Sequence, residues 1–161
     1  MITTITQESW RNQLNNSELL FNIVQTLDIS TEQIQEILKL GEIEDKEIVD
    51  QVLEACDNET FEAFLNGFIV YKRGKEEAKP GVKKKAPLPI KVRKSINNVI
   101  LKKLKIAFSL TNEDIIELFE KEGVSMTKNE LTTYFRKEGH KHYRRLEDYY
   151  LKNFLTAVSK L

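Results

Sequence analysis

Cysteine is nearly missing from this chain of 161 residues, and the single one, Cys56, cannot form a disulfide within it. It lies between acidic residues in LEACDNE, so we expect its thiol to be neutral and unreactive. No run of residues approaches the roughly 18 apolar positions that a membrane-spanning helix requires. The first ten residues, MITTITQESW, also lack the basic and apolar segments of a signal peptide. We therefore expect a cytoplasmic protein with no membrane segment.

Proline is also scarce, and all three prolines lie between residues 80 and 89. The surrounding stretch, residues 74–94, has few large apolar side chains and contains the run Lys83, Lys84 and Lys85. Such a composition does not form a packed element. We predict that residues 74–94 are a basic linker between a first domain at 1–73 and a second at 95–161.

Positive charge is almost absent from the first part of the chain, although the whole chain has a formal net charge of zero. Residues 1–70 hold 3 basic and 14 acidic residues, whereas residues 71–95 hold 10 basic and 2 acidic ones. Residues 96–161 are mildly basic, with 12 basic and 9 acidic residues. This asymmetry is informative about partners rather than about fold.

Apolar residues recur with helical spacing, and no segment shows the two-residue alternation of a strand. Two stripes follow the i, i+3, i+4 pattern of a buried helical face: Ile34, Ile37 and Leu38, and Ile115, Leu118 and Phe119. STEQ and TKNE are typical of capping boxes, and TNED places acidic residues in a first helical turn. Gly41 and Gly123 lie where a helix C-terminus calls for positive φ.

The two halves align with each other. LDISTEQIQEILK (27–39) matches FSLTNEDIIELFE (108–120) at an offset of 81, and FEAFLNGF (61–68) matches LKNFLTAV (151–158) at an offset of 90. Between them, Ile43, Ile48 and Val52 align with Met126, Leu131 and Phe135. We predict an all-α fold of two tandem four-helix repeats joined by the basic linker, with about seven extra residues in the second repeat.

The second repeat resembles the YehS-like family, bacterial tandem-repeat domains of unknown function. FRKEGHKHYR followed by LKNFL is the most distinctive part, and the likeness runs from NNVILKKLKIA through the final helix. The first repeat is similar only in DISTEQIQEIL and FLNGF, and it lacks the basic stretch. The resemblance implies the helical repeat and supplies no activity.

The extra residues of the second repeat form a basic stretch that we predict to be a contact surface. Its members are Arg136, Lys137, His140, Lys141, His142, Tyr143, Arg144 and Arg145. Lysine and arginine contact phosphates or carboxylates, and aromatic faces can stack on unpaired bases. The basic surface would be extended by Lys83, Lys84, Lys85, Arg93, Lys94, Lys102, Lys103 and Lys105.

Catalytic and metal chemistry are disfavoured. His140 and His142 have no cysteine nearby, and the surrounding cations would repel a metal ion. The chain also lacks phosphate-binding loops, nucleophile elbows and cofactor motifs. We therefore expect no enzyme activity, no metal and no cofactor.

Two binding functions remain open. The leading hypothesis is a protein-interaction or regulatory module, with an unknown protein partner or self-association as a homodimer. The alternative is a nucleic-acid-binding protein that uses the linker and the second repeat. One version of it is a helix-turn-helix with Lys128, Asn129, Thr132, Thr133 and Arg136 exposed, although Phe119 stands where such motifs usually pack a small residue.

Overall fold

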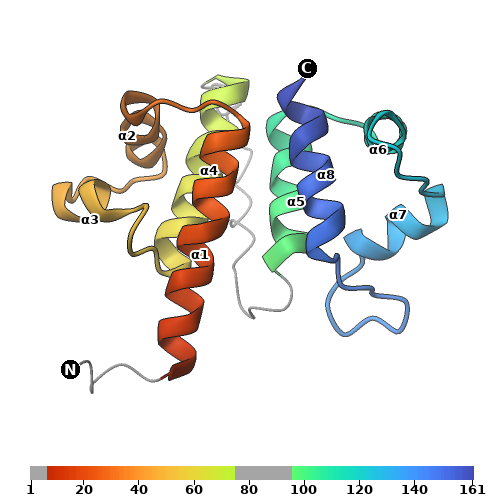
Figure 1. The fold of residues 1–161 in the computed structure, drawn as a ribbon, viewed down its shortest axis with the longest axis horizontal. Helices are drawn as coiled ribbons and strands as arrows, with labels where there is room; N and C mark the ends of the chain where they lie inside the picture. Colours follow the sequence, from red (N-terminus) through yellow and green to blue (C-terminus); the bar gives the residue numbers. More distant parts are fainter. Residues whose placement is uncertain (1–6, 75–95) are drawn as a thin grey trace, which may run out of the picture. The chain divides into compact units, whose positions relative to one another are not determined.

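The computed structural model describes residues 7–74 and 96–161, with side chains in the first helix described from residue 16 (Figure 1). Within these residues the structure has eight helices and no strand, which confirms the all-α prediction. The helices are α1 (Gln7–Thr26), α2 (Thr31–Leu40), α3 (Lys46–Gln51), α4 (Asn58–Arg73), α5 (Ile96–Ala107), α6 (Asn112–Lys121), α7 (Lys128–Phe135) and α8 (Asp148–Ser159). None of the described helices combines the length and the apolar character that crossing a membrane would demand.

The chain divides into two compact units, residues 1–68 and 69–161, and the division falls inside α4. The predicted linker at 74–94, with Lys83, Lys84 and Lys85, lies outside the described residues apart from Gly74.

In the first unit, α2 and α4 approach each other at backbone distance. A Cβ atom added to Gly67 would overlap the carbonyl oxygen of Ile37, and one added to Gly41 would overlap that of Ala63. Gly41 is therefore required for this close contact rather than for positive φ, since its φ is −85°. The predicted positive φ at Gly41 is wrong, because the next residue, Glu42, adopts it instead at 70°. Gly123 does have positive φ, at 76°.

The helix starts follow the local sequence closely. Ser30 and Gln33 form the predicted capping box at α2, and Thr111 and Asp114 form another at α6. At α7 the Thr127 side chain accepts a hydrogen bond from the amide of Glu130, 3.1 Å away, and no reciprocal bond completes a box there.

In the second unit, α5 and α8 lie side by side, and α6 and α7 pack along this pair (Figure 1). The centre is aromatic: the rings of Phe119 and Phe154 lie 5.9 Å apart, and Tyr150 meets Phe119 edge to face at 6.3 Å. Phe119 is fully buried, which explains why this position does not hold the small residue of a helix-turn-helix.

Replacing Phe119 by alanine should destabilise the second unit, because the substitution removes a fully buried ring from the contacts with α8. We expect a loss of about 3–5 kcal/mol in the free energy of unfolding, measured by urea titration with circular dichroism. The control is Phe21→Ala, where the ring is 48% exposed and the change should stay below about 1 kcal/mol. Equal losses in the two variants would contradict this packing.

Candidate functional site

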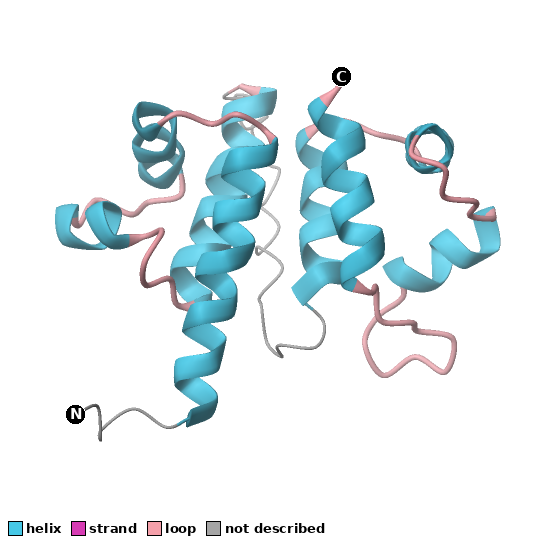
Figure 2. Ribbon diagram, viewed as in Figure 1, coloured by secondary structure: helices cyan, strands magenta, loops and turns pink. Residues whose placement is uncertain are grey.

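The predicted basic contact surface forms one loop between α7 and α8, shown as the long connecting segment in Figure 2. We call residues 136–145 the basic loop. Arg136 ends α7 by adopting extended backbone, with φ −66° and ψ 154°. Two turns follow, in which the amide of His140 donates to the carbonyl of Lys137 at 3.0 Å and that of Tyr143 to the carbonyl of His140 at 2.9 Å. The loop therefore has a defined backbone although it contains no helix or strand.

The basic loop turns its charges outward. All of its arginine, lysine and histidine side chains are exposed, and only Tyr143 is half-buried. The loop holds five Lys and Arg residues against one acidic residue, Glu138. No ion pair joins these cations to a carboxylate among the described residues. Their charge is thus available to a partner.

His140 and His142 interact with each other. Their ring centroids are 5.6 Å apart, and the backbone amide of His142 donates to Nδ1 of His140 at 3.0 Å. This bond requires an unprotonated Nδ1 on His140, which leaves its Nε2 free to face solvent. No group of three or more His, Cys, Asp or Glu side chains suited to a metal ion occurs in the part of the chain that the structure describes.

Both ends of the basic loop are held by one buried asparagine, Asn98 of α5. Its Nδ2 donates to the carbonyl of Tyr134 at 3.0 Å, before the loop, and to that of Arg144 at 2.9 Å, near its end. Its Oδ1 accepts a hydrogen bond from the amide of Leu146 at 2.9 Å. Asn98 is only 6% exposed, so these three bonds satisfy backbone groups that water reaches poorly.

The neighbouring Asn97 continues this arrangement. Its Nδ2 donates to the carbonyl of Leu146 at 3.0 Å and to Oδ1 of Asp148, in the first turn of α8, at 2.7 Å. We call Asn97 and Asn98 the asparagine clamp. The sequence analysis did not predict this clamp. A signal was present in the helical spacing, because Asn97 precedes Leu101 and Leu104 by four and seven residues and so lies on the buried face of α5.

Tyrosines surround the loop without supplying an ionised phenol. Burial raises the pKa of Tyr134, against the opposing effect of its hydrogen bond to Arg144, and burial likewise raises the pKa of Tyr143. The Tyr143 hydroxyl is buried and has no hydrogen-bond partner. Tyr149, four residues beyond Arg145, is 60% exposed and meets Tyr150 at 5.4 Å. The loop is thus bordered by one exposed aromatic ring.

Not all of the remaining predicted basic residues extend the exposed surface. Lys103 is only 2% exposed and cannot contribute to an exposed surface, which corrects the prediction. The Lys105 ammonium lies over the Phe135 ring, 5.0 Å from its centroid. Arg93 and Lys94 lie outside the described residues.

Fewer of the five side chains predicted for a helix-turn-helix surface are exposed than expected. The second helix, α7, ends at Phe135, and Thr132 and Thr133 are half-buried rather than exposed. Lys128 pairs with Glu113 of α6 at 3.1 Å. Only Asn129 and Arg136 remain as exposed residues outside an ion pair.

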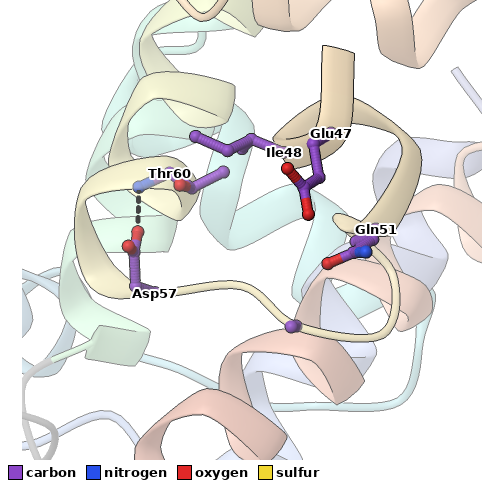
Figure 3. Close-up of a pocket in the computed structure, with 6 residues that line it drawn as sticks. Glu47, Ile48, Gln51, Asp57 and Thr60 are labelled. Carbon is purple, nitrogen blue, oxygen red and sulfur yellow. Dashed lines mark hydrogen bonds between the residues drawn. The ribbon is translucent and has the colours of Figure 1, made fainter. Parts of the chain in front are cut away.

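Two open hollows occur away from the loop. One, of about 270 Å³, lies between α3 and the start of α4 in the first unit and is drawn in Figure 3. The other, of about 340 Å³, lies at the turn between α6 and α7 and is lined by Ile116, Glu120, Gly123, Val124, Ser125 and Met126.

Cys56 of the first unit is fully buried, and its thiol donates a weak hydrogen bond to the carbonyl of Asp57 at 3.7 Å. Burial raises the pKa of the Cys56 thiol to about 12, and the negative charge of Asp57 adds to the effect. The thiol is therefore neutral near pH 7, as the sequence predicted, and is a poor nucleophile.

Comparison with known proteins agrees with the sequence resemblance. Residues 97–160 match the model of a family described as "Protein of unknown function (DUF1456)". The chain is 28% identical over 153 residues to "Uncharacterized protein YehS" of Escherichia coli (strain K12), which covers 89% of this chain and 94% of that protein. The resemblance to the YehS-like family is confirmed. The matched segment begins at Asn97 and contains the asparagine clamp and the basic loop. No solved structure gives a significant match.

Replacing Asn98 by alanine should leave two carbonyls and one amide without their partners at the ends of the basic loop. Because each poorly satisfied buried group costs about 1–3 kcal/mol, we expect a loss of about 2–4 kcal/mol after partial hydration. Urea titration measures this loss, and hydrogen exchange should show a faster rate at the Leu146 amide. The matched control is exposed Asn129→Ala, and a change as small as that of the control would contradict the clamp.

The buried thiol gives a pH dependence with a definite sign. Between about pH 9 and pH 12 the unfolded chain ionises Cys56 while the folded protein keeps it neutral. The free energy of unfolding of the wild type should therefore fall with rising pH relative to that of Cys56→Ala, which has no thiol to ionise. The free energy of unfolding of both proteins is measured by circular dichroism across this pH range. If it changes with pH in the same way for both, the Cys56 thiol is not shielded from solvent.

Proposed function

We propose that this chain is a non-enzymatic helical binding module, and that the basic loop is its contact surface. The observation that supports this most is the exposure of five Lys and Arg side chains, none in an ion pair among the described residues, on a loop whose two ends are tied to α5 by the buried Asn98. Side chains carried on a preorganised backbone lose less conformational entropy on binding than those of a free loop. A lone buried cysteine suits a reducing compartment, so we place this role in the cytoplasm.

The partner that this surface fits best is an acidic protein surface, with the chain acting as a protein-interaction or regulatory module. Arginine and lysine form charge-assisted hydrogen bonds with carboxylates, and complementary charge accelerates association. The exposed cations of the basic loop lie on a projecting connection between two helices, an arrangement suited to contact with another surface.

A nucleic acid is the second candidate, favoured by the aromatic groups in and beside the loop. The exposed rings of His140, His142 and Tyr149 accompany the cations, and such a combination suits phosphate contacts together with base stacking. The acidic first unit weighs against this candidate, because it would repel a polyanion.

We also infer that the two units are copies of one four-helix repeat, with domains at 1–73 and 95–161 and a linker at 74–94. Equivalent hydrogen bonds in the two units support this inference. In the first unit the Asn16 side chain donates to that of Asn58 at 2.8 Å, and in the second unit the Asn97 side chain donates to that of Asp148 at 2.7 Å. These pairs are related by the offsets of 81 and 90 that align the sequences. The α3–α4 connection spans residues 52–57, whereas the α7–α8 connection spans 136–147, so the basic loop is specific to the second copy.

Fluorescence anisotropy with two labelled probes, an oligoglutamate peptide and a single-stranded RNA, tests the proposal at low and at physiological salt. We expect the oligoglutamate to bind with a dissociation constant of about 100 μM or tighter at low salt, and more weakly as salt screens the charges. The triple variant Lys137→Ala, Lys141→Ala, Arg145→Ala should weaken this binding at least about tenfold.

The matched control is Lys39→Ala, Lys121→Ala, Lys152→Ala, which removes the same charge from exposed positions outside the loop. Equal effects of the two triple variants would contradict a localised contact surface. RNA binding that is more than about tenfold tighter than oligoglutamate binding, and that depends on the loop, would favour the second candidate.

A further inference from the structure

The third helix of the first unit has an uncovered face. None of the residues of α3 is buried. Ile48 is 39% exposed and Leu53, in the turn that follows, is 37% exposed. Leu131, the residue of the second unit that aligns with Ile48, is completely buried. The first unit therefore presents to solvent an apolar side chain whose counterpart belongs to a core.

This face borders the hollow between α3 and α4. Glu47, Ile48 and Gln51 project from α3, and Asp57 and Thr60 lie opposite them at the start of α4 (Figure 3). The hollow has a volume of about 270 Å³, compared with roughly 30 Å³ for one water molecule in the liquid. We call α3, the turn through residue 57 and this hollow the α3 face.

The α3 face and the residues that flank it are strongly negative. Residues 42–59 contain eight acidic residues and one basic residue, and all nine are exposed. Asp45 and Asp57 accept hydrogen bonds from the first turns of α3 and α4, at 2.9 Å and 2.7 Å respectively. The carboxylates of Glu47, Asp50 and Glu54 are not used as helix caps and so can bind cations.

The basic loop complements this face in two respects. It carries five Lys and Arg residues against one acidic residue, so it can neutralise the carboxylates around the hollow. Tyr149, just beyond the loop and 60% exposed, can cover Ile48 and Leu53 with apolar surface. Interfaces commonly combine an apolar centre with a polar rim in this way.

We propose that the α3 face binds the basic loop of a second copy of this chain. The inference rests on the proposed function and names its partner. Two such contacts, each chain giving its loop to the other, close a symmetric dimer. Having two such contacts also doubles the surface area that the dimer buries. A stable interface buries about 1,200 Å² or more, which is more than one short loop can bury by itself.

Analytical ultracentrifugation of the full chain at low and high salt tests the dimer, with two charge-reversal variants. The loop variant is Lys137→Glu, Lys141→Glu, Arg145→Glu, and the face variant is Glu47→Lys, Asp50→Lys, Glu54→Lys. All six positions are exposed, so both variants should keep the helical circular dichroism of the wild type. We expect the wild type to dimerise at low salt, and each variant by itself to dimerise at least about tenfold more weakly.

Mixing the two variants gives the sharpest result. In the mixture each reversed loop meets a reversed face and each native loop meets a native face, so both contacts are attractive and the dimer should return. A contact made within one chain could not be restored by mixing. A mixture that stays monomeric would therefore overturn the proposal, as would a monomeric wild type at low salt.

The apolar part of the contact is tested by a separate variant and a matched control. Ile48→Ala should weaken the dimer several-fold, whereas Phe21→Ala, which removes a similarly exposed ring from α1, should leave it unchanged. Equal effects would overturn the placement of the interface at α3. If the wild type is monomeric but its loop still binds oligoglutamate, only the second copy is excluded as the partner. If that binding is also absent, the proposed function fails with it.

Discussion

The asparagine clamp is the interaction on which the candidate site depends. A loop that leaves one helix and enters another without regular structure must find partners for the backbone groups that it buries. Asn97 and Asn98 supply these partners from one turn of α5, through bonds of 2.9–3.0 Å to backbone groups at both ends of the loop. The exposed cations between these ends are thereby carried on a backbone that is fixed at each side.

The two units differ in the connection that precedes their last helix. In the first unit Asn16 donates a hydrogen bond to Asn58, and Ser17 aligns with Asn98. The α3–α4 connection spans only residues 52–57, whereas the α7–α8 connection spans 136–147. The first unit presents the uncovered α3 face, whereas the second presents a basic loop. Opposite charge on two surfaces is a basis for association between chains.

Local signals in the sequence predicted much of this structure, and long-range contacts account for what they missed. The capping box at Ser30 and Gln33 and the basic loop could be recognised from a few neighbouring residues. The clamp joins residues up to 51 positions apart, so no local pattern gives its bonds. The predicted positive φ at Gly41 is wrong for the same reason, because this position requires glycine for its close contact with the carbonyl of Ala63 in another helix. The burial of Lys103 likewise depends on packing, which charge alone does not predict.

On this proposal the asparagine clamp prepares the basic loop for binding, and a comparison of two affinities tests that role. Asn98→Ala changes no charge, so the affinity of this variant for oligoglutamate measures the contribution of loop geometry by itself. We expect anisotropy titrations to show binding about tenfold weaker than that of the wild type, under conditions where circular dichroism shows the variant to be folded. An unchanged affinity would contradict it, because the cations would then bind equally well on an unrestrained loop.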